Sequence, residues 1–332
     1  MPTTCRSDLG IALDNRTVAS PSALEQFGYC YRIASACYPQ ERHFGIRKRL
    51  SFALRLFFLY GATLEQVDAF FSESPVRRFV GALPDFKEQV YIQQVRPYFY
   101  RNSAKDDRLH FVMSHFRLLE ATHQGAVIQA MYDGSLPPIV IWEGGQELSF
   151  DVGYHSYVMK EGLLRLNFLV NGATLYRFVF WLMTHQGEPT LCIGAVQGGR
   201  GTLETNRHFT KEFWGLRPLN MAMCAIRCYA QAAGIRQIYT FEKANMWGQR
   251  ISQETDLDRF WREQGATAVP RTPYLKLSVE IPRKDVADIP TRKRSAYKRR
   301  YAFLDGATMA LFVQYTRYMK HATSMADEVQ AS

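Results

Sequence analysis

The chain has 332 residues, of which 47% are hydrophobic, 14% aromatic and 22% charged, and its formal net charge is +10 at pH 7. This composition excludes a disordered chain, and the length favours about two domains. The positive charge indicates anionic partners, such as nucleic acid, an anionic membrane surface or a phosphorylated ligand. Residues 282–300 hold eight Lys and Arg against two Asp, so +6 of the +10 lies in this segment.

The termini and cysteines indicate a cytoplasmic protein, with peripheral attachment to the inner membrane left open. The N-terminus has no apolar core of a signal peptide. The six cysteines form no CxxC pair, and no histidine matches the spacing of Cys224 and Cys228, so the pattern predicts reduced core thiols rather than a metal site. We expect residues 1–20 and 321–332 to be disordered.

Residues 21–136 are predicted to form a helical domain, because apolar residues recur at three-to-four spacing. The predicted helices cover 24–39, 46–61, 64–74 with Thr63 as cap, and 107–134 as one or two helices. His110, His115 and His123 fall in the last of these without the i, i+4 pairing of a helical metal site. We interpret these histidines as packing or surface residues.

The most apolar window, residues 50–62, is too short to span a bilayer and is interrupted by Arg55. Basic residues 47–49 precede it. Two interpretations stay open, namely a basic amphipathic surface helix and the more common buried helix with a charged start.

The pattern changes at Pro137-Pro138, where short runs rich in β-branched and aromatic residues begin. Asn171-Gly172 is a strong hairpin signal, and His185-Gln186-Gly187 marks another turn. The predicted strands of this antiparallel meander are 138–144, 147–154, 163–172, 174–183 and 189–198.

A helical period returns at 216–234, with Pro218 in the first turn and Gly234 at the end. The remaining predicted elements are a strand at 235–241, a helix at 256–266, a strand at 274–282 and a long basic helix at 290–320. The fold class is therefore α+β, with an N-terminal helical region, a mixed and mostly antiparallel sheet with flanking helices, and a long basic C-terminal helix. The second domain is expected to cover residues 137–320.

The order of elements over residues 160–282 resembles the acyl-CoA N-acetyltransferase (GNAT) fold. Phe260-Trp261 and Gly265 occupy the place of that family's aromatic-aromatic-x-x-x-Gly stretch. The resemblance implies that a cofactor enters where the fourth strand parts from the fifth. It also implies that the turn after the fourth strand and the next helix start bind a pyrophosphate.

The sequence departs from the GNAT pattern at the points where chemistry is expected. The glycine-rich stretch 197–201 ends well before the predicted helix, which opens instead at 215–218. Trp261 replaces a tyrosine often used as general acid and has no titratable proton. The fourth strand carries no Glu to act as base, so the catalytic residues stay unassigned.

A second resemblance covers residues 90–310. Its motifs are Lys160-Glu161-Gly162, Gln197-Gly198, Thr210-Lys211, Gly215-Leu216-Arg217-Pro218, FWREQGA, Ile289-Pro290, Lys293-Arg294, Tyr297 and Arg299-Arg300-Tyr301. Together they resemble the VirK/YbjX family (the DUF535 proteins), with Trp214 as a departure. The resemblance implies a bacterial protein linked to virulence, envelope integrity and antimicrobial-peptide resistance, and in one branch to stress or DNA-damage responses, but no settled reaction.

Two groups of residues are candidates for binding. A phosphate-bearing donor would be bound by Gln197, Gly198, Arg200, Lys211, Arg217 and Asn245. The reason is strongest for Lys211 and Arg217, because cations beside a helix start are unfavourable unless an anion is bound there. Arg200 as a solvated loop residue and Asn245 as a plain turn residue stay open as alternatives.

The second group is the charged face of the C-terminal helix. Tyr297, Tyr301 and Leu304 form an apolar stripe that would dock this helix. The candidate residues for a nucleic-acid or lipid surface are Arg292, Lys293, Arg294, Lys298, Arg299 and Arg300. A solvated helix face is the alternative.

Two functional hypotheses follow. The first is a GNAT-like acyl or aminoacyl transferase, or a degenerate relative, whose donor is acyl-CoA, acyl carrier protein or aminoacyl-tRNA and whose acceptor is a peptide or envelope component. The second is a non-catalytic accessory protein that binds nucleic acid or an anionic membrane through its basic C-terminal helix.

Overall fold

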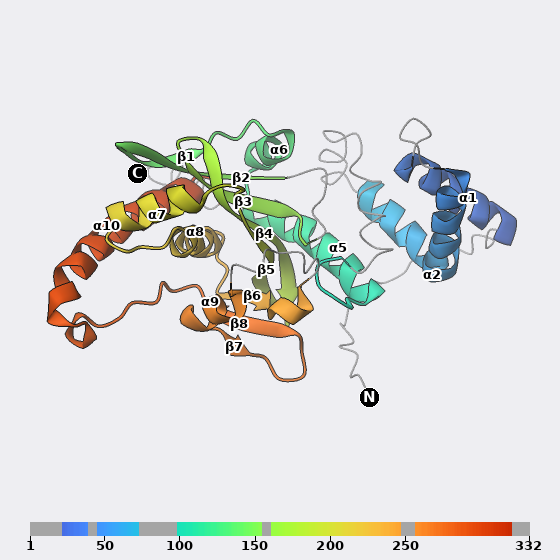
Figure 1. Cartoon of the computed structure of the whole chain (residues 1–332). Coiled ribbons are helices and arrows are strands. Elements are labelled where there is room, and N and C mark those ends of the chain that lie inside the picture. Colours follow the sequence, from blue (N-terminus) through green and yellow to red (C-terminus); the bar gives the residue numbers. More distant parts are fainter. Residues whose placement is uncertain (1–21, 39–44, 73–97, 155–160, 247–255, 321–332) are drawn as a thin grey trace, which may run out of the picture. The chain divides into compact units, whose positions relative to one another are not determined.

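The structure is a computed structural model that describes residues 22–38, 45–72, 98–154, 161–246 and 256–320 (Figure 1). The chain forms two compact units, Met1–Gly61 and Ala62–Ser332, each of which is described by itself. The predicted domain boundary at residue 137 stays a prediction. The expected disorder of 1–20 and 321–332 lies outside the described residues.

The first unit holds α1 (Ala23–Cys37) and the first part of α2 (Ile46–Ser72). Ser22 begins α1 with a capping box, in which its hydroxyl accepts from the Glu25 N–H and its own N–H donates to the Glu25 carboxylate. Tyr38 and Phe52 pack edge to face with ring centroids 5.2 Å apart, next to the buried side chain of Leu56. This contact helps to hold the two helices together.

One helix boundary was predicted wrongly. A new helix was expected to begin after Thr63, whereas α2 continues through this position to Ser72. Residues 46–72 contain no proline, and a single Gly61 costs a helix only about 1 kcal/mol relative to alanine. A residue that can cap a helix therefore does not end one.

The second unit contains one eight-stranded sheet in the order β1-β2-β3-β4-β5-β6-β8-β7. The first five strands form the predicted antiparallel meander, and only β5 and β6 pair in parallel. The α+β class with a mostly antiparallel sheet is confirmed. The strands are β1 (Ile139–Gly144), β2 (Gln146–Gly153), β3 (Leu164–Val170), β4 (Ala173–His185), β5 (Glu188–Gly198), β6 (Gln237–Phe241), β7 (Thr267–Ala268) and β8 (Tyr274–Ser278).

Both predicted hairpin turns are present. Asn171 and Gly172 have φ of 51° and 76°, and Gln186 and Gly187 have φ of 52° and 80°. Two consecutive left-handed residues are the signature of the type I′ turn, which matches the twist of the strands it joins. These local signals fixed the register of β3, β4 and β5.

Apart from α2, the described helices of the second unit match the prediction except at one place. Leu203–Glu212 forms a helix, α7, where the sequence was interpreted as an intervening stretch. Only Phe209 of this helix is buried, so few apolar residues mark it in the sequence. The other helices are α5 (Lys105–Thr122), α6 (Gly125–Asp133), α8 (Pro218–Ala232), α9 (Leu257–Glu263) and α10 (Thr291–Thr316).

The helices lie on both faces of the sheet (Figure 1). On one face, Phe180 of β4 packs against Tyr229 of the almost wholly buried α8, and α10 covers α8. On the other face, Trp181 packs against Phe111 of α5 with ring centroids 5.3 Å apart. Adjacent residues of β4 thus enter the two cores, as the two-residue period of a strand requires.

Candidate functional site

The sheet opens between β5 and β6. These strands pair in parallel at three positions, from Thr190 with Gln237 to Cys192 with Tyr239. The hydroxyl of Thr240 then donates to the Ile193 carbonyl over 3.2 Å, after which β5 continues to Gly198 and, among the described strands, pairs with β4 alone. Among the described residues, no strand neighbours β5 on the β6 side from Gly194 to Gly198, an edge of about 13 Å. Such an edge presents backbone hydrogen-bonding groups to a ligand.

A β-bulge lies where the strands part. Val179 pairs with Ala195 but Phe180 pairs with Ile193, so Gly194 is an extra residue in β5. A Cβ atom on Gly194 would lie only 1.8 Å from the backbone carbonyl oxygen of Glu161. The position therefore needs glycine, and the close approach brings Glu161 to the opening of the sheet.

Glu161 is a functional candidate that the sequence analysis missed. The base was expected on the strand equivalent to β5, whereas Glu161 precedes β3 and its backbone carbonyl lies beside the bulge. Its side chain is half-buried. The available signal was its place in the motif Lys160-Glu161-Gly162, of which Lys160 lies outside the described residues.

The glycine-rich turn follows the free edge of β5. The Gly199 N–H donates to the Leu175 carbonyl over 2.9 Å. A Cβ on Gly199 would lie 2.2 Å from the Thr174 carbonyl oxygen, and Gly201 has a φ of 69°. The turn is therefore held tightly against the hairpin between β3 and β4, in a form that only glycine accepts at these two positions.

A helix does follow this turn, contrary to the sequence interpretation. α7 begins at Leu203, two residues after Gly201. The Thr202 hydroxyl donates to the Gly199 carbonyl over 2.9 Å and does not cap the helix. The N–H groups of the first turn of α7 thus lack a side-chain cap, which is the arrangement that binds phosphate at helix N-termini.

The tertiary structure weakens the sequence argument for an anion at α8. Lys211 lies in the last turn of α7, where a cation suits the helix dipole. Arg217 is the N-cap of α8, and its Nη1 lies 2.8 Å from Oε2 of Glu263. A carboxylate of the protein thus faces the cation at this helix start. Assignment of Lys211 and Arg217 to a donor site stays a prediction.

The other predicted donor residues lie at the ends of the two strands that part, β5 and β6. Gln197, Gly198 and Arg200 are exposed at the end of β5 and in the turn beyond it. Asn245 lies in a 3-10 helix just after β6, where its carbonyl accepts from the Arg101 N–H over 2.7 Å. The structure therefore brings Gln197, Gly198 and Arg200 together and places Asn245 beyond the other strand.

A row of polar residues crosses the sheet beside Gln197 and was not predicted. Asp151, Asn167, Arg177 and Gln197 are successive partners on β2, β3, β4 and β5, so their side chains share one face. Arg177 Nε donates to Oδ1 of the buried Asn167 over 2.7 Å. Burial, and then the charge of Arg165, lower the pKa of Arg177, whereas Asp151 raises it. The row became visible only once the register was known.

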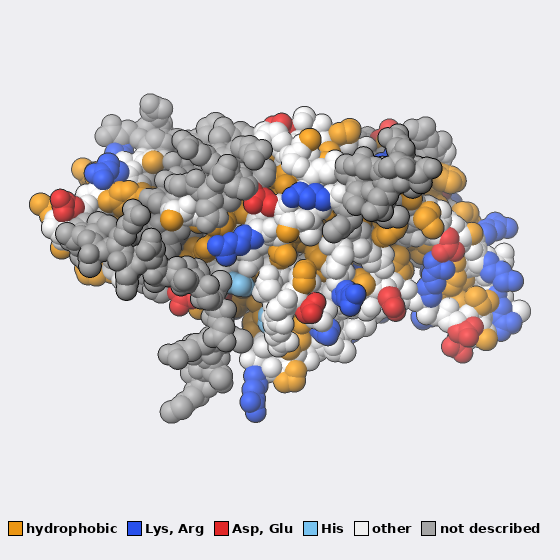
Figure 2. Space-filling view, turned by 180° about the vertical axis from the view of Figure 1, so that it is seen from behind, with side chains coloured by type: hydrophobic (Ala, Val, Ile, Leu, Met, Phe, Trp, Pro, Cys, Tyr) orange, Lys and Arg blue, Asp and Glu red, His pale blue; other side chains and the backbone are white. Residues whose placement is uncertain are grey.

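The predicted basic surface of α10 divides into two groups. Arg294 donates to the Ile289 and Ala287 carbonyls, and Arg300 donates to the Trp214 carbonyl and stacks on Tyr297. These two arginines hold α10 against the segments that carry these carbonyls. The exposed residues whose side chains make no hydrogen bond or ion pair with other described residues are Arg292, Lys293, Lys298 and Arg299. Figure 2 shows Lys and Arg side chains gathered at this end of α10.

Metal and thiol chemistry find little support in the described part of the chain. No three His, Cys, Asp or Glu side chains gather there in a way that would hold a metal ion. Burial raises the pKa of Cys224 to about 11 and that of Cys228 to about 12, despite the nearby Arg227. Both thiols are therefore protonated at neutral pH and are poor nucleophiles.

Across the described ranges, no helix is long and apolar enough to cross a membrane.

The comparisons with known proteins define the class of this chain. The family described as proteins of unknown function (DUF535) matches residues 42–311, and the chain belongs to this family. An Escherichia coli (strain K12) protein named uncharacterized protein YbjX is 25% identical over 63% of this chain and 67% of its own length. An uncharacterized Haemophilus influenzae protein is 26% identical over 64% of this chain and 72% of its own length.

Proposed function

We propose that this protein transfers an acyl or aminoacyl group from a phosphate-bearing donor that enters the sheet between β5 and β6. The observation that carries the proposal is the combination of a parted parallel strand pair and a glycine-rich turn leading into α7. In this arrangement the first turn of α7 binds the phosphates, aided by Arg200. The donor's arm follows the free edge of β5 toward Gly194. The donor is acyl-CoA, acyl carrier protein or aminoacyl-tRNA.

In this proposal the reacting carbonyl of the donor lies at the bulge of β5. An amine of the acceptor attacks the donor's thioester or ester carbonyl, the new C–N bond forms, and the thiol or hydroxyl leaves with a proton. The N–H of Gly194, set outside the regular ladder by the bulge, is the candidate donor to the oxyanion. Glu161, whose backbone carbonyl lies beside Gly194, is the candidate base that takes the proton from the attacking amine.

The acceptor in this proposal is an amine of a peptide or envelope component. This choice rests on the roles in envelope integrity, virulence and antimicrobial-peptide resistance that the family resemblance implies. N-acylation removes a positive charge or adds an apolar chain, and either change alters how strongly a cationic peptide binds to an anionic envelope. The reaction is proposed to take place in the cytoplasm.

Native mass spectrometry of the purified protein tests for the donor directly. A co-purifying acyl-CoA, acyl carrier protein or aminoacyl-tRNA is expected. Arg200→Ala should then weaken binding of that donor in calorimetry, and Arg207→Ala is the matched control. Arg207 is also exposed, but it lies beyond the first turn of α7 and pairs with Glu204. Equal donor affinity of the two variants would reject the assignment of Arg200.

A second candidate function rests on α10. Its four exposed cations, Arg292, Lys293, Lys298 and Arg299, lie within the first turns of a helix that is otherwise fastened to the protein. We propose that they bind nucleic acid through its phosphates, in which case the stress or DNA-damage branch of the family becomes relevant. This binding is also compatible with an aminoacyl-tRNA donor.

The α10 proposal is tested by fluorescence anisotropy with labelled RNA and DNA at several salt concentrations. Changing all four cations to Gln should lower the affinity and flatten its salt dependence. A charge-matched control changes four exposed cations elsewhere, namely Arg236, Arg262, Arg271 and Lys276. If both variants lose the same affinity, binding follows net charge alone and α10 is not the site.

A further inference from the structure

The outer side of α2 carries a continuous apolar row. Ile46, Leu50, Leu54 and Phe58 repeat every four residues and are 69%, 45%, 40% and 78% exposed. Residues four apart lie on the same side of a helix, so the row runs for about 18 Å along α2. The opposite side, with Phe52, Ala53 and Leu56, is buried in the first unit. The exposed row is thus additional to the side that the fold needs.

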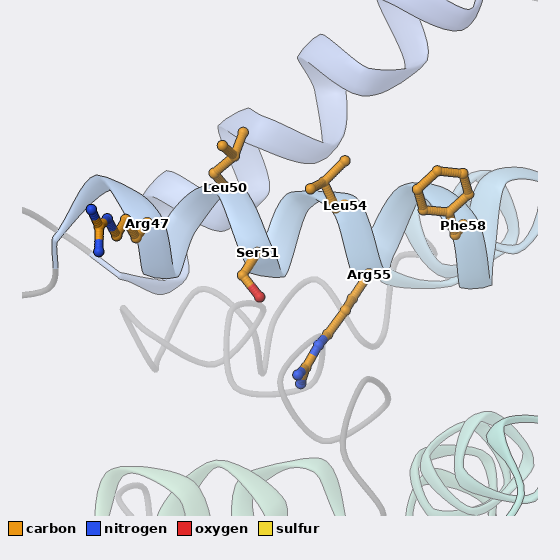
Figure 3. A pocket seen from close by; sticks show the side chains of 6 residues that line it. All are labelled: Arg47, Leu50, Ser51, Leu54, Arg55 and Phe58. Carbon is orange, nitrogen blue, oxygen red and sulfur yellow. The ribbon is translucent and has the colours of Figure 1, made fainter.

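A row of polar and cationic residues lies next to the apolar row. Arg47, Ser51 and Arg55 each follow one of its members in the sequence and are exposed. A hollow of about 550 Å³ joins the two rows, and Figure 3 shows the side chains that line it. Its lining residues are Arg47, Leu50, Ser51, Leu54, Arg55 and Phe58. The side chains of Leu50, Leu54 and Phe58 project from the helix in Figure 3, and Arg55 extends away from them.

The charge of this segment has one sign. Residues 46–58 contain four basic residues and no acidic one. One of the four, Arg49, is buried, and Lys48 lies over the ring of Tyr38 at 5.3 Å. Arg47 and Arg55 are therefore the cations that flank the apolar row. An apolar row flanked by cations is complementary to a surface with anionic groups above an apolar layer.

We propose that this face of α2, made of Ile46, Arg47, Leu50, Leu54, Arg55 and Phe58, docks the protein on an anionic lipid surface. The apolar row enters the boundary between headgroups and acyl chains, where it is removed from water. The arginines bind lipid phosphates, and their long stems let them do so while the row stays inserted. The net charge of +10 adds attraction toward the anionic surface before contact.

The same segment carries an alternative that the sequence left open. Residues 50–62 were interpreted either as a buried helix or as a basic amphipathic surface helix. Over residues 46–58, α2 buries one side and exposes an apolar side, so both descriptions apply to different faces. The proposal does not depend on the donor site between β5 and β6, because none of its residues belongs to that site.

The test is flotation of the full-length protein with phosphatidylcholine vesicles, with and without phosphatidylglycerol. We expect binding only to vesicles that contain phosphatidylglycerol. Arg47→Gln with Arg55→Gln should weaken this binding by about thirtyfold. The charge-matched control, Arg236→Gln with Arg271→Gln, changes two exposed arginines of the second unit and should retain most of it.

A second variant, Leu50→Gln with Leu54→Gln and Phe58→Gln, should abolish vesicle binding. Its control is Leu24→Gln, which changes an 81% exposed leucine on α1. Failure of the wild-type protein to bind phosphatidylglycerol vesicles would overturn the proposal. So would unchanged binding of the arginine variant, which leaves the apolar row intact and guards against misfolding of the triple variant. A wild-type dimer in light scattering that the triple variant dissociates would instead make this face a protein interface.

Discussion

The backbone N–H of Leu182, on β4, donates a 3.1 Å hydrogen bond to Nδ1 of His115, on α5. The pairing of β3 with β4 ends at Phe180, and no other described strand pairs with the edge of β4 beyond it. On the same edge, Nε2 of His110 lies 3.0 Å from the Thr184 carbonyl. Two histidines of α5 thus form hydrogen bonds with this edge of β4, as a neighbouring strand would. The bond from Leu182 requires an unprotonated Nδ1, so the proton of His115 is on Nε2, which faces the Tyr132 hydroxyl.

Replacing His115 should separate its hydrogen bond from its volume. His115→Leu leaves the buried Leu182 N–H without an acceptor and should cost about 1–3 kcal/mol of unfolding free energy. His115→Asn should recover part of this loss, because its Oδ1 takes nearly the place of Nδ1. Urea unfolding of the three proteins measures the difference. Equal stability of the Leu and Asn variants would show that the hydrogen bond contributes nothing.

Stability should decrease as the pH falls below about 6.5. Burial lowers the pKa of both His115 and His123 to about 3, so the folded protein keeps them neutral. The unfolded chain protonates them near its ordinary histidine pKa and therefore binds more protons between about pH 6.5 and about pH 3. Each histidine should contribute up to about 1.4 kcal/mol per pH unit in this range.

Urea unfolding at a series of pH values measures that slope. His115→Asn removes one of the two buried imidazoles, so its slope below about pH 6.5 should be shallower by up to about 1.4 kcal/mol per pH unit. An unchanged slope would mean that His115 is protonated in the folded protein, which contradicts its bond from Leu182.

Glycine should be required at the bulge and in the glycine-rich turn. Gly194→Ala and Gly199→Ala each place a Cβ within 2.2 Å of a backbone carbonyl oxygen, so the backbone must shift. We expect a loss of about 1–3 kcal/mol for each in thermal or urea unfolding. Gly125→Ala is the control, since a Cβ there meets nothing within 4 Å at the start of α6. Stability of all three variants equal to wild type would contradict these close approaches.

The buried Arg227 should not be replaceable by lysine. Its Nη1 and Nη2 donate to the side chain and backbone of Gln264 over 2.7 and 3.1 Å, and its Nε donates to the Ser278 carbonyl over 3.2 Å. Burial lowers its pKa to about 10, and it remains charged at neutral pH. Lysine cannot make the fork, so Arg227→Lys should cost about 1–3 kcal/mol. The exposed Arg262→Lys is the control, and equal effects of the two changes would contradict the role of the fork.

Glu161→Gln should separate donor binding from transfer. The amide keeps the volume of the side chain but cannot accept a proton at neutral pH. Once a donor is known, its affinity in calorimetry should stay within about twofold while the transfer rate falls by about a hundredfold or more. A normal rate in this variant would remove Glu161 from the proposed chemistry and leave the donor site unaffected.

Local signals made much of the fold predictable. Asn171-Gly172 and Gln186-Gly187 fixed two turns, and Pro218 with Gly234 bounded α8, because each signal acts through the backbone of a few consecutive residues. The family also followed from motifs that can be read in order along the chain. Two predictions were wrong. The helix start expected after Thr63 is absent because α2 continues through it, and α7 was missed because few apolar residues mark it.

The family, the α+β class and the hairpins could be predicted from the sequence, which also offered Gln197, Gly198 and Arg200 as candidates for donor binding. Three features became visible only in the folded chain: α7 follows their turn, the backbone of Glu161 approaches Gly194, and Glu263 faces Arg217. The last two depend on contact between residues distant in the chain. A strand slipped by one residue would send every side chain to the other face, so no local pattern can encode such a meeting.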